Sequence, residues 1–123
     1  MKNLSALVGA IVFAWLPESE RPHAPGPKYR PVLVIDTDIK NRRIRLAYGT
    51  SQKTEVNYAG EITMAKDDVP GLSKDTKFAL KKSFWVPLDN AYFCHPKTGS
   101  LTIIGYIPHY KRDSFYERAL EAI

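Results

Sequence analysis

Two short motifs, each at the end of an apolar segment, have the residue types that bind a phosphate group. Arg30 heads an Arg-Pro pair that opens the apolar run of residues 31–35. Thr50 and Gln52 close the next alternating segment, residues 43–48. A guanidinium forms paired, charge-assisted hydrogen bonds with phosphate oxygens, and a threonine hydroxyl can donate to a non-bridging oxygen. Fixed at strand ends, two such groups could stabilise the charge that develops when a phosphate is attacked.

Each of these residues also has a purely structural interpretation. Arg30 could end a strand and pair with a nearby carboxylate, which contributes little on a protein surface. Thr50 could hydrogen-bond the backbone of its own turn, as threonine in a Gly-Thr-Ser sequence often does. Both interpretations stay open at the level of the sequence.

A proline-rich loop precedes the first motif and contains a third candidate, His23. Four prolines and Gly26 within residues 17–28 exclude regular structure there. A histidine ordinarily titrates near neutral pH, so His23 is a candidate general base for catalysis. The alternative is a solvated loop histidine without a catalytic role.

The segments that would position these residues are short and mostly β-like. Strands are predicted at residues 31–35, 43–48, 61–64 and 101–107, and a polar turn at residues 36–42. Residues 76–86 are predicted as a strand, or as a short helix followed by a strand. Pro70 and Gly71 indicate a turn. Closely spaced short strands are typical of a small antiparallel barrel.

The C-terminal segment has a helical pattern instead. Asp113 or Ser114 can cap a helix, and the apolar residues Phe115, Leu120 and Ile123 are expected on its buried face.

The N-terminal apolar run, residues 6–16, has two interpretations. It is too short to span a bilayer as a helix. After Lys2 it resembles the apolar part of a secretory signal. Its Val, Ile, Phe and Trp content, ended by Pro17, favours a buried first strand.

The composition permits a soluble domain with an anionic partner. Hydrophobic residues make up 44% and charged residues 25% of the 123-residue chain, and the net charge is +5. A basic balance favours nucleic acid, an acidic protein segment or a lipid surface, although it also serves solubility alone. The single cysteine, Cys94, excludes an internal disulfide and fits a reducing compartment.

Taken together, the two motifs resemble those of the MazF/PemK family of toxin endoribonucleases. In that family an Arg-Pro pair opens one strand and a Thr-x-Gln closes the next, as Arg30 and Thr50 do here. Residues 9–17 resemble the family's first strand, and residues 71–85 resemble, more loosely, an Asp-containing segment that runs into Lys-Ser. The resemblance covers about residues 9–88 and leaves residues 89–123 without support.

The resemblance implies a mostly β fold: a small SH3-like antiparallel barrel with a C-terminal helix, in a single domain over residues 1–123. It implies a sequence-selective, metal-independent endoribonuclease, in which the 2′-hydroxyl of single-stranded RNA attacks the adjacent phosphorus. Arg30 and Thr50 match the family's catalytic positions, and Asp75 or Thr76 falls at its acidic position. The loop before Arg30 departs from the family pattern, so the general base stays open, with His23 and Asp75 as further catalytic candidates. The predicted substrate-binding residues are Lys28, Ser51, Gln52, Lys53, Thr76 and Lys77.

The implied partners are single-stranded RNA and an acidic, partly disordered antitoxin segment that fills the same groove. The resemblance also implies a homodimer with the RNA groove at its interface. No cofactor and no metal are predicted, because no Cys/His pair has the spacing of a zinc site. We expect a cytoplasmic protein without a membrane segment.

Two other functions compete with this one. The same barrel could bind RNA or an acidic peptide without cleaving it, because a fold does not fix a function. A secreted small β protein would follow from the signal-peptide interpretation. Aromatic side chains that could stack on bases, or fill a core, are Trp15, Phe84, Trp85 and Tyr92. Basic side chains that could follow a phosphate backbone, or only be solvated, are Lys28, Arg42, Arg43, Arg45, Lys53, Lys81 and Lys82.

Overall fold

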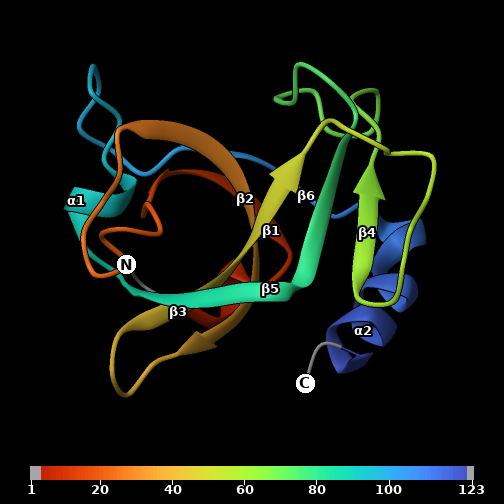
Figure 1. Cartoon of the computed structure of the whole chain (residues 1–123), viewed down its shortest axis with the longest axis horizontal. Coiled ribbons are helices and arrows are strands. Elements are labelled where there is room, and N and C mark those ends of the chain that lie inside the picture. Colours follow the sequence, from red (N-terminus) through yellow and green to blue (C-terminus); the bar gives the residue numbers. More distant parts are fainter. Residues whose placement is uncertain (1–3, 122–123) are drawn as a thin grey trace.

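The computed structural model describes residues 4–121, which form one strongly curled antiparallel sheet of six strands (Figure 1). The strands are β1 (Ala10–Leu16), β2 (Lys28–Asp38), β3 (Arg43–Thr50), β4 (Glu61–Met64), β5 (Thr76–Pro87) and β6 (Ile103–Tyr106). Their order in the sheet is β4-β5-β3-β2-β1-β6. The helical elements are η1 (Leu4–Leu7), α1 (Asn90–Phe93), η2 (His109–Lys111) and α2 (Arg112–Glu121). The predicted mostly β fold with a C-terminal helix is confirmed, and the sheet curls into a half-barrel.

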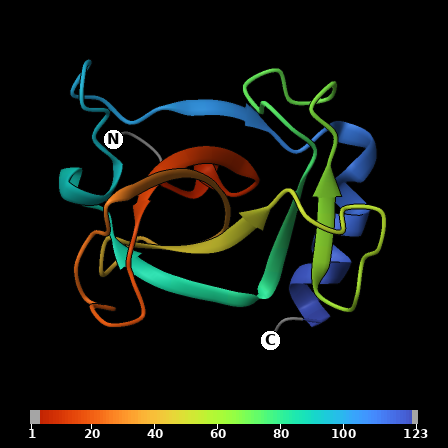
Figure 2. The same cartoon turned by 45° about the horizontal axis from the view of Figure 1, so that its top comes forward.

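The sheet is buried on both faces, because its central strands have apolar side chains at consecutive positions. In β1, Val12 belongs to a core cluster that includes Phe93 of α1, whereas Ile11 belongs to a second cluster that includes Phe115 of α2. Successive side chains of a strand point to opposite faces, so one strand contributes to both clusters. Figure 2 shows α1 and α2 at opposite ends of the molecule. Each helix contributes to a different cluster, α1 through Phe93 and α2 through Phe115.

β5 is a continuous strand, which decides between the two predictions for residues 76–86. Its pairing with β3 is irregular: Leu46 lies opposite Phe84, but Tyr48 lies opposite Ala79. Extra residues on one strand bend it, and β5 turns sharply in Figures 1 and 2. The bend lies beside Tyr48 on β3.

The turn predicted at residues 36–42 is too long, because β2 continues to Asp38. Asp36 lies opposite Arg45, and Asp38 lies opposite Arg43. The Arg43 guanidinium donates to Asp38 Oδ2 at 2.8 Å. Opposite charges across two strands stabilise a sheet, so these polar residues extend the strand instead of ending it.

The C-terminal helix is confirmed, but its predicted buried face is partly wrong. α2 begins at Arg112, directly after η2. Phe115 is 2% exposed, as expected, whereas Leu120 is 69% exposed. Ala119 packs against the core in its place. Residues four apart share a helix face, so Ala119 lies beside Phe115 and Leu120 is turned away. Ile123 lies outside the described residues.

The apolar N-terminal run contributes β1 as an interior strand of the sheet, next to the edge strand β6. β1 pairs with β2 on one side and with β6 on the other. This placement agrees with the buried-strand interpretation; Lys2, on which the signal-peptide interpretation drew, lies outside the described residues. In the part of the chain that the structure describes, no helix is long and apolar enough to cross a membrane.

Two elements near the C-terminus differ from the sequence-based prediction. α1 was not predicted; the carboxylate of Asp89 caps it by accepting from the Ala91 N–H at 2.9 Å. β6 is shorter than the expected strand at residues 101–107, because Leu101 makes only an isolated bridge with Cys94. α1 was missed because its single turn, Asn90–Phe93, is too short to give a periodic pattern in the sequence.

Candidate functional site

The N-terminal end of β2 and the C-terminal end of β3 bring Arg30 and Thr50 to one cleft. Val32 lies opposite Tyr48 in this antiparallel pair. The same register continued by two residues puts Arg30 opposite Thr50, on the face that Val32 and Tyr48 share. This main cleft has a volume of about 420 Å³. It is lined by Leu16, Pro17, Glu18, Pro27, Lys28, Arg30, Tyr48, Gly49, Thr50 and Ser51.

The Arg30 side chain is exposed at this cleft. None of the ion pairs in the described part of the chain involves it. The structural interpretation, in which Arg30 pairs with a carboxylate, therefore has no support there. Its guanidinium can offer both arms of its fork to an anion in the cleft.

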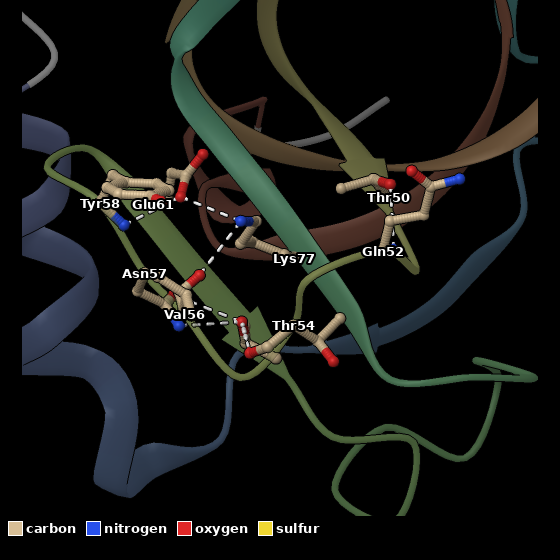
Figure 3. A network of polar contacts seen from close by, with 9 residues as sticks. Thr50, Gln52, Thr54, Val56, Asn57, Tyr58, Glu61 and Lys77 are labelled. Atoms are coloured by element: carbon tan, nitrogen blue, oxygen red, sulfur yellow. Dashed lines mark hydrogen bonds and ion pairs between the residues drawn. The ribbon is translucent and has the colours of Figure 1, made fainter.

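Thr50 has a local hydrogen bond that leaves its proton free. Its Oγ1 accepts from the backbone N–H of Gln52 at 3.1 Å (Figure 3). A hydroxyl has one proton to donate in addition to two lone pairs. The turn interpretation of Thr50 is therefore correct, and it is compatible with donation to a ligand.

Two further clefts adjoin the main one and share Tyr48 with it. The first has a volume of about 320 Å³ and is lined by Tyr48, Gly49, Thr50, Gln52, Lys53, Glu61, Lys77, Ala79 and Lys82. The second has a volume of about 220 Å³ and is lined by Pro17, Glu18, Ser19, Pro22, Tyr48, Lys82 and Phe84. We call the three clefts together the Tyr48 groove.

Tyr48 is the centre of this groove and was not singled out from the sequence. Its ring is half-buried and lies 4.6 Å from the Phe84 ring, measured between centroids. Burial raises the pKa of the Tyr48 phenol. A usable sequence signal existed, because side chains alternate along a strand and Tyr48 is two residues before Thr50.

Asp75 and Thr76 lie beside the groove, not in it. Asp75 lines a fourth cleft of about 280 Å³, which shares Ser51 with the main cleft. Its Oδ1 accepts from the Lys66 N–H at 2.9 Å. The Thr76 side chain is buried, and its Oγ1 donates to the Lys74 carbonyl at 2.9 Å.

Lys77 lines the groove, but its ammonium is directed into the protein. The residue is 5% exposed. Nζ donates to the Val56 carbonyl at 3.0 Å and lies 3.1 Å from Glu61 Oε1 (Figure 3). The backbone N–H of Tyr58, assisted by Lys77, lowers the pKa of Glu61 from its ordinary range.

The loop before Arg30 places Glu18 in the groove instead of His23. His23 is exposed and lines none of the clefts that form the groove, whereas Glu18 lines two of them. A Cβ on Gly26 would lie 1.9 Å from the Leu16 carbonyl oxygen, so only glycine lets the returning loop pass so close to β1. Nothing in the sequence indicated Glu18, because its place depends on this loop path.

The other aromatic candidates have structural roles, apart from Phe84. Tyr92 is buried, and the Trp15 indole donates to the Cys94 carbonyl at 3.1 Å. Trp85 is 37% exposed, with the Arg43 guanidinium 4.9 Å from its ring centroid.

The basic candidates divide in the same way. Lys28, Lys53 and Lys82 line the groove. Arg45 is tied to Ser83 Oγ by a 2.6 Å hydrogen bond, and Arg42 lines a separate cleft of about 180 Å³. Lys81 is exposed and lines none of the groove clefts.

Within residues 4–121, no three His, Cys, Asp or Glu side chains gather as a metal site would require.

Comparison of the sequence with protein-family models and with curated proteins gives no match. Comparison of the fold with solved structures does. The Mycobacterium tuberculosis toxin MazF-mt6 is similar with a TM-score of 0.63 and 18% sequence identity, over 92% of this chain and 94% of that one. A protein described as an Mtb toxin is similar with a TM-score of 0.55 and 19% identity, over 82% of this chain and 97% of that one. The chain therefore has a MazF-like fold over most of its length.

Proposed function

We propose that this protein is the toxin of a toxin–antitoxin pair, a sequence-selective and metal-independent endoribonuclease that acts on single-stranded RNA. The observation that carries the proposal is the convergence of Arg30 and Thr50 on one open cleft. The MazF-like fold and the motif resemblance of residues 9–88 support the same conclusion from independent directions.

In the proposed reaction, the 2′-hydroxyl of one nucleotide attacks the phosphorus that follows it. Its proton passes to a base in the cleft, the bond to the 5′-oxygen of the next nucleotide breaks, and that oxygen takes up a proton from water. The products are a 2′,3′-cyclic phosphate and a free 5′-hydroxyl. The rate depends on stabilising the extra negative charge on the phosphate oxygens in the transition state.

Arg30 and Thr50 would supply that stabilisation. The Arg30 guanidinium would donate two hydrogen bonds to phosphate oxygens, and the Thr50 hydroxyl would donate a third to the same phosphate group. Donors already fixed before reaction are worth about 2.7–4 kcal/mol each in a comparable oxyanion site. For the base we propose Glu18, which lines the main cleft, in preference to His23 and Asp75, which do not line it.

Sequence selectivity would come from the rest of the Tyr48 groove. The Tyr48 and Phe84 rings form an aromatic wall on which a splayed base can stack. Lys28, Lys53 and Lys82 would follow the phosphates, and Ser51 and Gln52 would donate to base edges. Asp75 would act from the neighbouring cleft, which it lines. The buried Thr76 would support that side of the groove from within, because its hydroxyl already donates to the Lys74 carbonyl.

The proposed partners are RNA and an acidic antitoxin protein. From the family resemblance we also propose a homodimer and a cytoplasmic location. These proposals go beyond the fold itself, because function depends on the site.

Incubation of the purified protein with a long RNA in EDTA, followed by mapping of the cut ends, tests the proposed function. We expect cuts at a recurring sequence, with 5′-hydroxyl ends. An RNA with a 2′-deoxy nucleotide on the 5′ side of the cut lacks the nucleophile and should resist. Cleavage of that RNA would contradict the mechanism, and RNA binding without any cleavage would identify a binding module instead.

A further inference from the structure

Lys77 is buried, which is unusual for a lysine. It lies on β5, opposite Thr50 of β3 on one side and Thr63 of β4 on the other. The residue is only 5% exposed. Lysines are almost never fully buried unless they are paired, because an ammonium loses its hydration there.

Three groups compensate the buried charge, and two of them belong to one loop. Nζ donates to the Val56 carbonyl at 3.0 Å and lies 5.6 Å from the centroid of the Tyr58 ring. The third group is the Glu61 carboxylate, 3.1 Å away at the start of β4. Val56 and Tyr58 are both in the segment of residues 51–60 that joins β3 to β4, and Figure 3 shows this segment around the ammonium.

The same loop is held by further bonds from β4. Glu61 Oε1 accepts from the Tyr58 N–H at 2.9 Å. Thr63 Oγ1 donates to the Thr54 carbonyl at 2.9 Å, and Asn57 Nδ2 donates to Thr63 Oγ1 at 3.1 Å. Thr63 is the cross-strand neighbour of Lys77, so one short stretch of sheet anchors most of an otherwise exposed loop.

This loop begins with residues that line the Tyr48 groove. Ser51, Gln52 and Lys53 follow Thr50 directly and line its clefts. Lys53 has a φ of 53°, a left-handed conformation that is unfavourable for a residue other than glycine. The shape of this turn therefore depends on contacts made further along the loop.

We propose that Lys77 is a positioning residue: with Glu61 it holds the loop of residues 51–60, and thereby the Thr50–Gln52 side of the cleft, in its active shape. The inference rests on the proposed function, and it gives Lys77 a role through the loop instead of direct contact with RNA. The ammonium is already engaged by the Val56 carbonyl and the Glu61 carboxylate, and the residue is 5% exposed, so it is poorly placed to bind a phosphate.

Salt dependence separates the two roles. A lysine that neutralises an RNA phosphate releases a counterion, so removing it reduces the magnitude of the negative slope of log K against log salt by about 0.7 for a single strand. A lysine that only holds the loop leaves this slope unchanged. Hydrogen exchange of the loop amides changes in the second case and not in the first.

The experiment compares Lys77→Met with Lys53→Met and Lys40→Met. Lys53 is an exposed residue of the groove, and Lys40 is exposed in the β2–β3 turn, so all three variants lose one positive charge. Three quantities are measured: hydrogen exchange of the free protein over residues 51–60, the salt slope for an RNA made uncleavable by a 2′-deoxy nucleotide, and kcat.

For Lys77→Met we expect faster exchange in the loop, an unchanged salt slope, and a kcat lowered by about 10- to 100-fold, because small misplacements reduce rates this much. Lys53→Met should reduce the magnitude of the slope by about 0.7 and weaken RNA binding, without the faster exchange over the rest of the loop that is expected for Lys77→Met. Lys40→Met should change neither the loop exchange nor kcat.

A reduced salt slope for Lys77→Met with unchanged loop exchange would overturn the proposal, and so would unchanged exchange together with unchanged kcat. If Lys77→Met does not fold, the same measurements on Lys77→Met combined with Glu61→Gln, which leaves no unpaired charge, decide the question. Thr63→Val releases the Thr54 carbonyl without disturbing a charge and should give a smaller effect of the same kind. If the wild-type protein cuts no RNA, the proposed function fails, while the exchange measurement still tests whether Lys77 holds the loop.

Discussion

Arg30 is the single residue on which the proposed chemistry depends most. Replacing it with alanine removes the one guanidinium that lines the main cleft. We expect Arg30→Ala to lower the cleavage rate by on the order of 10²-fold or more. Arg30→Lys should restore little of the activity, because an ammonium lacks the planar fork. Single-turnover cleavage assays measure both.

The thermal melting temperature is the control for these variants. Arg30 is exposed and pairs with no carboxylate among the described residues, so its loss should barely change stability. A folded Arg30→Ala protein that cuts RNA at the wild-type rate would mean that the site lies elsewhere.

Glu18 and His23 are distinguished by where the loop places them. Glu18 lines two clefts of the groove, and His23 lines none of the three. A positioned general base contributes about 10²- to 10⁴-fold to a rate. We therefore expect Glu18→Gln to reduce kcat within that range and His23→Ala to leave it nearly unchanged. The opposite result would assign the base to His23 and require the loop to rearrange when RNA binds.

At the level of elements, the two ends of the β2–β3 hairpin have different roles: one forms part of the cleft, and the other is the turn that connects the strands. One end presents Arg30 and Thr50 to the cleft, and the other ends in the turn after Asp38. The Asp38 carboxylate accepts from the Asn41 side chain at 2.9 Å and from Arg43 at 2.8 Å. These hydrogen bonds lower the pKa of Asp38 from 3.8 to about 2, and the bond from the Asn41 side chain has the largest effect.

The shifted pKa of Asp38 predicts an acid-dependent loss of stability. Because its folded pKa lies below the unfolded one, the stabilisation is complete above pH 3.8 and is lost as the pH falls towards about 2. Asp38→Asn should flatten the dependence of the urea midpoint on pH in this window. Asp67→Asn, at an exposed aspartate, is the control. An equal pH dependence in wild-type and Asp38→Asn proteins would contradict this assignment.

The sequence predicted those elements whose own residues determine them. β4 has the predicted bounds, Glu61–Met64, because its alternation is short and bounded by a turn. The extension of β2 to Asp38 could not be predicted, since it depends on arginines across the strand pair. The exposure of Leu120 was also missed, because the apolar pattern of α2 is weak and Ala119 fills the contact.

The site was predictable to the extent that its residues lie in one hairpin. Arg30 and Thr50 come together because antiparallel pairing makes residues around a turn neighbours. Glu18 and Lys82 reach the same groove from the loop before β2 and from β5. The inward direction of Lys77 depends on Val56 and Glu61, which no local pattern connects to it.

For the whole molecule, the net charge is +5, and several of the basic residues line the Tyr48 groove. The groove is lined by Lys28, Arg30, Lys53 and Lys82, in addition to the internally paired Lys77 and Glu61. Glu18 is the other carboxylate among these lining residues. Such a surface attracts a polyanion over a distance of about one Debye length, roughly 8–10 Å at physiological salt.

A groove of this charge should accept an acidic protein segment as well as RNA, because both present spaced negative charges to the same donors. We expect an antitoxin with an acidic, aromatic-containing tail that becomes ordered on binding, with its aromatic side chain against Tyr48 and Phe84. Such a segment should displace a labelled, uncleavable RNA in a competition assay, and its affinity should fall as salt rises.

Lys82→Glu provides the sharpest version of this test, because Lys82 lines two clefts of the groove and is exposed. Reversing its charge should weaken the binding of RNA and of the acidic segment together. Lys40→Glu, in the distant β2–β3 turn, makes the same change in net charge and should weaken both far less. An acidic protein that binds with wild-type affinity to the Lys82→Glu variant, and leaves RNA cleavage unaffected, would show that it occupies another surface.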